Sequence, residues 1–491
     1  MALTSNQRGL RKRFLVTLSV AVIGLAAGVA GWQLWPHECG EAQLNDKADG
    51  ECIGITDGAY VFNDPDKAKT PTDRKIMENI NDVQKLIKIE NDAVTAGSSR
   101  YVKVALLMPL TVSQARPPAI LLREILHSLE GSYVALHRAN HSPAFGDPSA
   151  VKIQLLLVNQ GSRQNADPDF IDGILKISQM NHPLVAVVGL GASVPNTKTA
   201  ADYLAQRGIP MVSAVASADS LTHLPLLWSV SPSNTEYAVR LKSFLDQQHV
   251  LRSGVIVYDR NPDLFTQSLA QAYHDQLGLY VKFPDQPFQG STINTPAAPD
   301  IFFPVVTNLC NAANDPNAPL DMVFYAGRVA DLGPFVEALK TRTCRQRPLT
   351  MLVVTSGFAG VQDTVGDLRG ETIKLGVATS ADPLSLGRNE PGTPPGYEAF
   401  RAEYYAQGFN DSPNSLDGFT ISHHDALATA TQAIRLAAIG RPTQAPNAED
   451  VAGQFGHLNL AYAVPAASGT LSFRSEGGTA TGEPIPIEQI G

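Results

Sequence analysis

Residues 184 to 204 have the pattern of a turn that could bind an anion at a helix N-terminus. The apolar run LVAVVG ends in the turn GLG, with Gly189 and Gly191 on either side of a leucine, and an amphipathic segment follows from Ser193. A dinucleotide-binding fingerprint needs a third glycine or alanine where this chain has Val194, and the Gly-Lys dipeptide of a P-loop does not occur. The turn therefore indicates either a plain strand-to-helix connection or a helix N-terminus whose N–H groups and hydroxyl suit a carboxylate.

The other residues that could do chemistry do not form a catalytic motif. His423 and His424 are adjacent, so on a helix they point about 100° apart and would not chelate one metal ion together. Asp425 is expected to cap or hydrogen-bond near the start of its helix. The chain has neither a Gly-x-Ser-x-Gly elbow nor a His-Glu-x-x-His motif, which argues against an exported hydrolase. We therefore predict no catalytic residue, no metal site and no cofactor.

The four cysteines lie in two local segments, which predicts the disulfides Cys39–Cys52 and Cys310–Cys344. Disulfides are typical of an exported protein. A zinc site is the alternative, but the short Cys-x-x-Cys spacing of such sites is missing. The residues before Cys39 are not the apolar, small-residue approach of a lipoprotein signal.

The N-terminus resembles a membrane anchor. Residues 1–13 are basic and are predicted to be cytoplasmic, and residues 14–35 form an uncharged run long enough to span a bilayer, with Trp32 and Trp35 at its end. This predicts a protein held at the extracellular face of the membrane by an N-terminal helix. The alternative is a signal peptide cleaved after the small residues 28–30, which would release a secreted protein.

Composition and charge limit the classes of function. The chain has 491 residues, of which 44% are hydrophobic and 17% charged, so it is large enough for two or three globular domains. Its net charge of −9 argues against nucleic-acid binding, because proteins that bind nucleic acid usually carry an excess of positive charge.

The order of the elements predicts an α/β fold with two lobes. Residues 36–100 form an extension before the first lobe, with one amphipathic helix around Asp73 to Glu90. Apolar strands alternate with amphipathic helices from residue 101, and the alternation starts again after residue 235. Such alternation is typical of parallel sheets flanked by helices, and the tail after residue 466 is predicted to be a β-hairpin. Ligands of such sheets lie beyond the carboxyl ends of the strands.

From about residue 101 to 489 the chain resembles the type I periplasmic binding proteins of the leucine/isoleucine/valine-binding branch. The resemblance rests on the order and spacing of five stretches: VVGLGASVPNTKTAADYLAQRGIPMVSAVASADSLT, WSVSPSNTEYAVRL, VIVYDRNPDLFTQSLA, DMVFYAGRVADLGPFVEAL and ASGTLSFRSEGG. It implies a two-lobed clamp with crossovers near 231, 380 and 460. The first lobe would comprise 101–231 and 381–460, and the second 232–380 and 461–491.

The resemblance also implies ligand contacts. The serine at the head of the third helix corresponds to Ser193, an Ala-Thr pair to Ala216 and Ser217, and the acidic residue that binds an ammonium group to Asp331. Two positions depart from the family, because Phe265 replaces a tyrosine and Asn234 stands where related receptors have an aspartate. The implied ligand-binding residues are Gly191, Ala192, Ser193, Ala216, Ser217, Phe265 and Asp331. The two serines and Asp331 could instead cap local turns or helices, and Phe265 could belong to the core.

The function that the resemblance implies is capture of a small polar ligand, such as an amino acid, for an ABC permease, without catalysis. A ligand-sensing receptor with the same clamp is the alternative, and an uncleaved N-terminal helix would favour it.

Overall fold

The structure of the protein is a computed structural model. It describes residues 46–48 and 51–491, except 98, 114–117, 179–181, 249, 292–296, 299, 382–385, 387–392, 410–414, 442, 476 and 483. The predicted cytoplasmic segment 1–13 and membrane segment 14–35 lie outside the described residues. Within the described part, no helix has the length and apolar character needed to cross a membrane.

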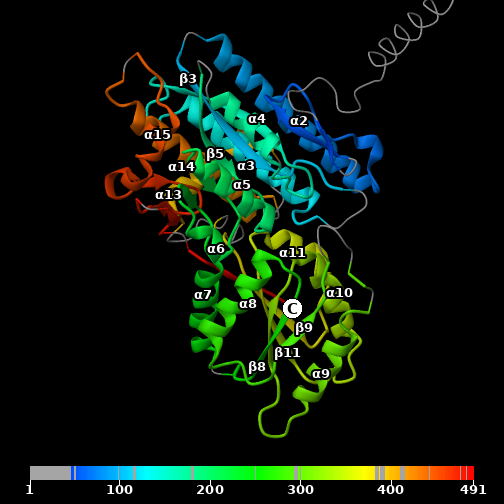
Figure 1. The fold of residues 1–491 in the computed structure, drawn as a ribbon. Coiled ribbons are helices and arrows are strands. Elements are labelled where there is room, and N and C mark those ends of the chain that lie inside the picture. The colour runs from blue at the N-terminus through cyan, green and yellow to red at the C-terminus, as the bar shows by residue number, and fades with distance from the viewer. Residues whose placement is uncertain are drawn as a thin grey trace, which may run out of the picture.

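Two sheets, each flanked by helices, form two lobes (Figure 1). The first lobe contains the sheet β1-β2-β4-β3-β5-β6-β7-β15, in which the pairs from β4 to β15 are parallel. Its strands are β1 Asp46–Ala48, β2 Glu51–Thr56, β3 Tyr101–Met108, β4 Lys152–Asn159, β5 Leu184–Gly189, β6 Met211–Ser213, β7 Leu227–Ser229 and β15 Gly478–Thr479. Its helices are α2 Pro71–Ala96, α3 Leu122–His141, α4 Pro168–Ser178, α5 Pro195–Gln206, α6 Asp219–Thr222, α13 Pro395–Ala406, α14 Gly418–Ala438 and α15 Ala448–Ala452.

The second lobe contains the sheet β16-β12-β11-β10-β8-β9, parallel except for its edge strand β16. Its strands are β8 Gly254–Asp259, β9 Gln286–Phe288, β10 Met322–Ala326, β11 Leu349–Val354, β12 Ile373–Ala378 and β16 Ile487–Ile490. Its helices are α7 Asn234–Gln247, α8 Leu264–Leu277, α9 Phe303–Ala313, α10 Val329–Lys340 and α11 Phe358–Val365. The predicted alternation of strands and helices is therefore present in both lobes.

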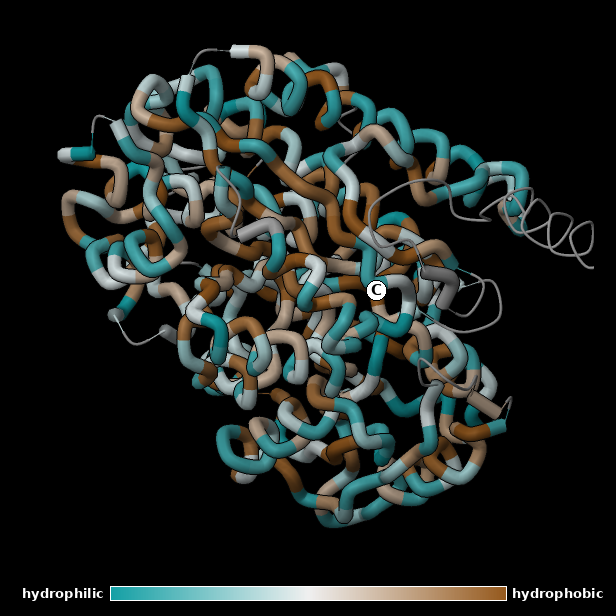
Figure 2. The backbone as a smooth tube through the Cα atoms, turned by 45° about the horizontal axis from the view of Figure 1, so that its top comes forward, coloured by the Kyte–Doolittle hydropathy of each residue, from teal (hydrophilic) through white to brown (hydrophobic). Residues whose placement is uncertain are grey.

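Apolar strands are buried in the interior of both lobes, and polar segments lie outside (Figure 2). In the first lobe, a glycine of α3 lets α14 pack closely on that helix. A Cβ atom at Gly131 of α3 would lie 2.0 Å from the carbonyl oxygen of Thr420 on α14, so only glycine allows this contact. Asp417 is the N-cap residue of α14, and its side chain accepts hydrogen bonds from the N–H groups of Phe419 and Thr420.

The extension predicted for residues 36–100 contributes to the first lobe instead of standing apart from it. Strand β2 pairs with β4, and the apolar face of α2 joins the core that contains α3. The predicted helix is longer than expected because Thr70 caps it and Pro71 occupies its first turn. The Asn91 side chain of α2 also pairs with the backbone N–H and carbonyl of Leu155 in β4, at 2.9 and 2.7 Å.

The last crossing between the lobes differs from the one expected near 460. Strand β15 pairs in parallel with β7, which keeps residues 478–479 in the first sheet, and β16 belongs to the second. The crossing therefore lies between Thr479 and Ile487. The predicted tail hairpin is limited to the antiparallel pair β13 (Val464–Pro465) and β14 (Thr470–Leu471) and to a Ser472–Thr481 bridge.

A disulfide joins Cys310 of α9 to Cys344, which follows α10, so this predicted pair is confirmed. Both cysteines are buried in the core of the second lobe. The other predicted pair is not described, because Cys39 lies outside the described residues.

Replacing Cys310 and Cys344 together with serine should lower the free energy of unfolding by roughly 3 to 4 kcal/mol, because the bridge closes a loop with a sequence separation of 34. Urea denaturation of the oxidised wild type and the double variant measures the difference. Reducing the wild type should move its midpoint towards that of the variant. Equal midpoints before reduction would contradict the prediction.

Candidate ligand-binding site

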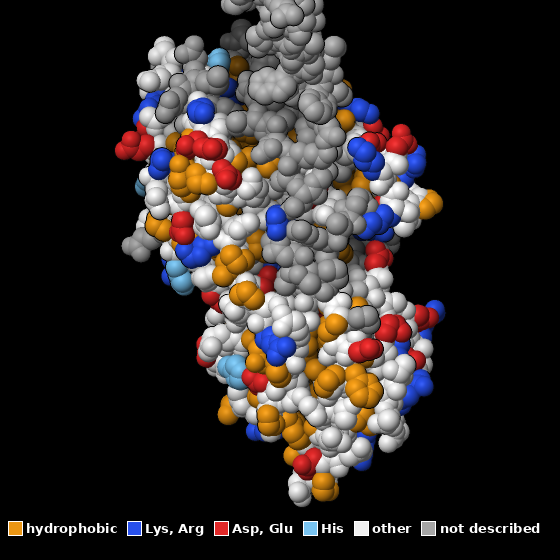
Figure 3. Space-filling view, turned by 45° about the vertical axis from the view of Figure 1, so that its right-hand side comes forward, with side chains coloured by type: hydrophobic (Ala, Val, Ile, Leu, Met, Phe, Trp, Pro, Cys, Tyr) orange, Lys and Arg blue, Asp and Glu red, His pale blue; other side chains and the backbone are white. Residues whose placement is uncertain are grey.

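A cleft lies where the carboxyl ends of the strands of the two sheets face each other. It contains about 670 Å³ of space free of protein atoms, part of which is open to solvent. Figure 3 shows the molecule narrowing between its lobes. The first lobe lines the cleft with Pro118, Ala119, Ile120, Leu121, Glu124, Ala192, Ser193, Val215, Ser217 and Phe419, and the second with Tyr237, Phe265, Arg328, Val329, Ala330, Val354, Thr355 and Ser356.

Ser193 lines the cleft but does not cap α5. The helix begins at Pro195 with Val194 as its N-cap residue, so the expected start near Ser193 is two residues early. The Ser193 hydroxyl oxygen instead accepts a hydrogen bond from the N–H of Ala218 at 3.1 Å. This bond ties the turn after β5 to the turn after β6 and fixes the hydroxyl at the cleft wall.

Gln164 occupies much of the predicted anion-binding turn. Its side-chain carbonyl accepts hydrogen bonds from the N–H of Ala192 at 2.8 Å and from the hydroxyl of Thr197 at 3.2 Å. A Cβ atom at Gly191 would lie 2.0 Å from this carbonyl oxygen, so the glycine makes room for Gln164. Gly191 is not among the lining residues, whereas Ala192 is. Because the Gln164 amide oxygen already accepts from the Ala192 N–H, this turn is a poor anion-binding site.

The turn after β6 contains two of the predicted ligand-binding residues, and only one of them lines the cleft. Ala216 packs in the core of the first lobe, and Ser217 lines the cleft. The carbonyl of Ser217 accepts a hydrogen bond from the N–H of Asn234 at 2.8 Å, and the Asn234 side chain donates to the carbonyl of Phe265 at 3.0 Å. The backbone N–H of residue 234 therefore links the two lobes, while the Asn234 side chain bonds within the second lobe instead of placing a free acid in the cleft.

Arg328 is the one cationic side chain among the lining residues in the described part of the chain. It lies two residues after the end of β10, at the carboxyl end of the second sheet. Its guanidinium pairs with Asp263 at 2.8 Å, lies 5.3 Å from the ring centre of Phe265, and donates to the carbonyl of Ser193 at 2.9 Å. The last contact reaches across the cleft to the first lobe. Sequence reasoning missed Arg328, although its place just after an apolar strand was a usable signal.

Asp331 lies in the first turn of α10 and is not among the lining residues. Its two carboxylate oxygens accept hydrogen bonds from the N–H of Ser291, at 3.1 and 3.0 Å. Burial raises the pKa of Asp331, while the Ser291 N–H opposes that rise. The ammonium-binding role implied by the resemblance stays a prediction, and it would require this carboxylate to turn towards the cleft.

Glu124 is a second buried carboxyl group, and it does line the cleft. It lies in the first turn of α3, where its Oε2 accepts a hydrogen bond from the N–H of Leu121 at 2.7 Å. Burial raises the pKa of Glu124 to about 8 and outweighs this hydrogen bond. Nearby, His127 and Asp417 form a buried ion pair at 3.1 Å. Glu124 was not predicted from the sequence, because the helix that carries it has an ordinary amphipathic pattern.

The adjacent histidines of α14 face different partners. His423 Nδ1 contacts the carbonyl of Phe419 at 2.8 Å, while His424 contacts Asp425 and Arg138, each at 2.7 Å. Asp425 is buried in the middle of the helix and accepts hydrogen bonds from the N–H groups of residues 467 and 468. It therefore fixes the segment after β13 instead of acting near a helix start.

Comparison with known proteins identifies the fold. No protein-family model and no curated protein sequence matches the chain. Among solved structures, the chain is similar to an ABC transporter substrate-binding protein from Desulfitobacterium hafniense in complex with Leu, with a TM-score of 0.56 and 15% identity over 80% of this chain and 98% of that one. It is also similar to a branched-chain amino acid ABC transporter protein from Thermus thermophilus with bound valine (TM-score 0.57, 14% identity, 79% and 93% covered).

A third similar structure is a solute-binding protein of an ABC transporter from Rhodopseudomonas palustris BisB5 in complex with 3,4-dihydroxy benzoic acid (TM-score 0.55, 13% identity, 79% and 92% covered). These likenesses confirm that the chain has the two-lobed fold of the type I periplasmic binding proteins.

Proposed function

We propose that the protein captures a small carboxylic acid between its two lobes and presents it to an ABC permease. The observation that carries the proposal is Arg328, a cation at the end of β10 whose guanidinium faces the hydroxyl-bearing turn at Ser193. An arginine can hold a carboxylate through two parallel hydrogen bonds. A ligand carboxylate would replace the Ser193 carbonyl as the partner of Arg328.

The rest of the cleft describes the remainder of the ligand. Tyr237, Phe265 and Phe419 supply aromatic surface, and Val215 and Val354 supply aliphatic surface. The ligand should therefore carry an apolar or aromatic body, as leucine, valine and dihydroxybenzoate do in the similar structures.

An amino acid would also need a partner for its ammonium group. Glu124 lines the cleft, whereas Asp331 is not among the lining residues and bonds to Ser291. We propose Glu124 as the nearer candidate and retain Asp331, Ser193, Ser217, Ala192 and Phe265 as the positions that the family resemblance assigns to ligand binding. Gly191 and Ala216 would support the wall from behind.

The proposed location is the outer face of the cell membrane, with residues 14–35 as the anchor. The disulfide of the second lobe fits an oxidising compartment. Binding would proceed by closure of the lobes on the ligand, without covalent chemistry.

A thermal-shift screen tests the proposal. It should compare leucine and valine with their deaminated acids, with hydroxybenzoates, and with leucinamide, which lacks the carboxylate. A ligand present at 100 times its dissociation constant adds about 2.7 kcal/mol to stability, so a true ligand gives a clear shift. We expect at least one carboxylate to stabilise the protein and leucinamide to fail. A shift with leucinamide equal to that with leucine, or no shift with any acid, would contradict the proposal.

A further inference from the structure

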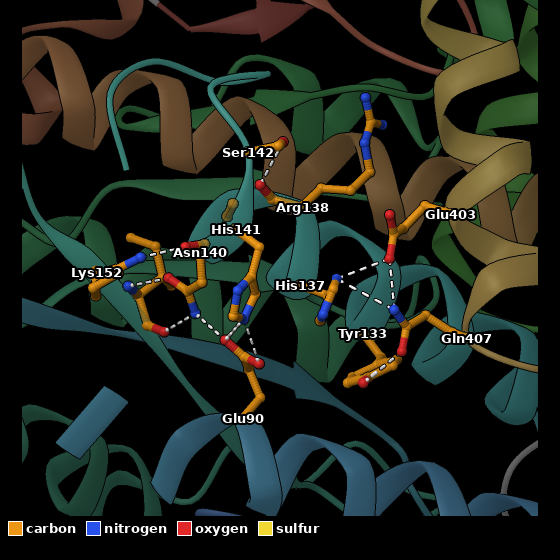
Figure 4. A network of polar contacts seen from close by, with 12 residues as sticks. Glu90, Tyr133, His137, Arg138, Asn140, His141, Ser142, Lys152, Glu403 and Gln407 are labelled. Atoms are coloured by element: carbon orange, nitrogen blue, oxygen red, sulfur yellow. Dashed lines mark hydrogen bonds and ion pairs between the residues drawn. The ribbon is translucent and has the colours of Figure 1, made fainter. Parts of the chain in front are cut away.

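Side chains from three helices of the first lobe meet on the side of α3, away from the cleft (Figure 4). Glu90 comes from α2, His137 and His141 lie one turn apart on α3, and Glu403 comes from α13. Residues four apart on a helix lie on the same face, so both imidazoles lie on one side of α3, where His141 contacts Glu90 and His137 contacts Glu403. One ligand atom each from Glu90, His137 and His141 lie within 4.8 Å of one another.

The distances between His141 and Glu90 are close to those between two ligands of one metal ion, and a ligand atom of His137 lies within 4.8 Å of both. His141 Nε2 lies 3.0 and 3.1 Å from the two carboxylate oxygens of Glu90. Two atoms bound tetrahedrally to zinc at about 2.0–2.1 Å lie about 3.3 Å apart. The rings of His137 and His141 stack with centres 4.4 Å apart and planes 25° apart, so the His137 ring must turn for its nitrogen to point at the same ion.

Residues other than Glu90, His137 and His141 orient these three side chains. His137 Nδ1 contacts the Glu403 carboxylate at 2.8 Å and the Gln407 amide at 3.3 Å. Both contacts use Nδ1, which leaves Nε2 for water or an ion, because the His137 side chain is 27% exposed. Asn140 donates to Glu90 Oε1 at 2.9 Å and holds that carboxylate in place. A carboxylate that orients a histidine from behind is the usual second layer of a metal site.

Ion pairing alone explains the arrangement of Glu90, His137 and His141 less completely than a bound metal ion does. It accounts for His141 with Glu90 and for His137 with Glu403. It does not require ligand atoms of all three residues to gather within 4.8 Å of one another. A cation bound by Glu90, His137 and His141 together accounts for that convergence, because carboxylates and neutral imidazoles are both metal ligands.

We propose that Glu90, His137 and His141 bind one divalent transition-metal ion, with zinc the favoured ion, and that the ion fastens α2 to the first lobe. Imidazole ligands favour zinc, copper or nickel, whereas calcium and magnesium prefer oxygen ligands. His141 is half exposed, which leaves room for water as a fourth ligand. This site was not predicted from the sequence, because Glu90 lies far from the histidine pair along the chain.

Calorimetric titration of the chelator-treated full chain with zinc sulfate tests the site. We expect one zinc ion per chain, a higher melting temperature with zinc, and a shift of the cobalt(II) spectrum towards the tetrahedral form. His141→Ala and His137→Ala should each weaken zinc binding at least 100-fold. His223→Ala is the matched control, because His223 is exposed and lies outside the cluster.

Glu90→Gln provides a variant that keeps a hydrogen-bonding side chain of the same size. It should keep the zinc-free fold, as judged by circular dichroism, and weaken zinc binding at least tenfold. The proposal is overturned if the wild type binds no zinc, or if His137→Ala and His141→Ala bind it as well as His223→Ala does. Loss of zinc binding in all variants, His223→Ala included, would also overturn it. Ligand binding in the cleft is measured separately, so it can fail without affecting this result.

Discussion

Replacing Arg328 with alanine is expected to weaken binding of the carboxylate ligand by roughly 30- to 1,000-fold. Removing one partner of a buried, hydrogen-bonded charge pair costs about 2 to 4 kcal/mol, and about 1.4 kcal/mol corresponds to a tenfold change in affinity. Arg328 is mostly buried between Asp263 and Phe265, so water cannot fully replace its hydrogen bonds. Calorimetric titration with the ligand found in the screen measures the loss.

Two further variants separate the charge from its geometry. Arg328→Lys keeps the positive charge but loses the paired N–H groups, so we expect an intermediate affinity. Arg369→Ala removes an exposed arginine that pairs with its neighbour Asp367, and it should leave affinity unchanged. Unchanged affinity in Arg328→Ala would mean that the ligand carboxylate binds elsewhere in the cleft.

The segment around Arg328 shows how much of the site could be predicted from the sequence. The apolar strand and the helix after it predicted a ligand-facing turn near "AGRVADLG", and β10 and α10 lie there. The family resemblance favoured Asp331, yet the residue that reaches the cleft is Arg328, three positions nearer the end of the strand. Periodicity locates the end of a strand well. Which of the next side chains faces the cleft depends on a distant partner, here the N–H of Ser291.

Contacts between distant segments account for the other differences. Gln164 fills the turn at Gly191 from a separate loop, and no local pattern predicts that insertion. Strand β15 has only two residues, too few for a period of two to be visible, and its pairing with β7 moved the last crossing. Helix α2 was predicted from its apolar face, but the partner of that face became known only from the structure. The disulfide was predictable because its cysteines are near each other in sequence.

Replacing Glu124 with glutamine is expected to remove a pH dependence from both folding and binding. Burial raises the pKa of Glu124 from about 4.5 to about 8, so the folded protein holds this proton while the unfolded chain releases it. The stabilisation that this bound proton provides is therefore complete below about pH 4.5 and is lost as the pH rises through 8. Between these values the free energy of unfolding falls by about 1.4 kcal/mol for each pH unit. Urea denaturation from pH 5 to 8 should show the wild type losing stability relative to Glu124→Gln.

Binding should depend on pH in the opposite direction if Glu124 holds the ammonium group of an amino acid. A cation beside Glu124 favours its charged form, so binding below pH 8 must release its proton, and affinity should rise with pH up to about 8. The deaminated acid should lack this rise, and Glu124→Gln should abolish it. Asp331→Asn is the matched variant, because its carboxylate is also buried but bonds to Ser291. If Asp331→Asn removes the rise and Glu124→Gln preserves it, the ammonium partner is Asp331, as the family resemblance implies.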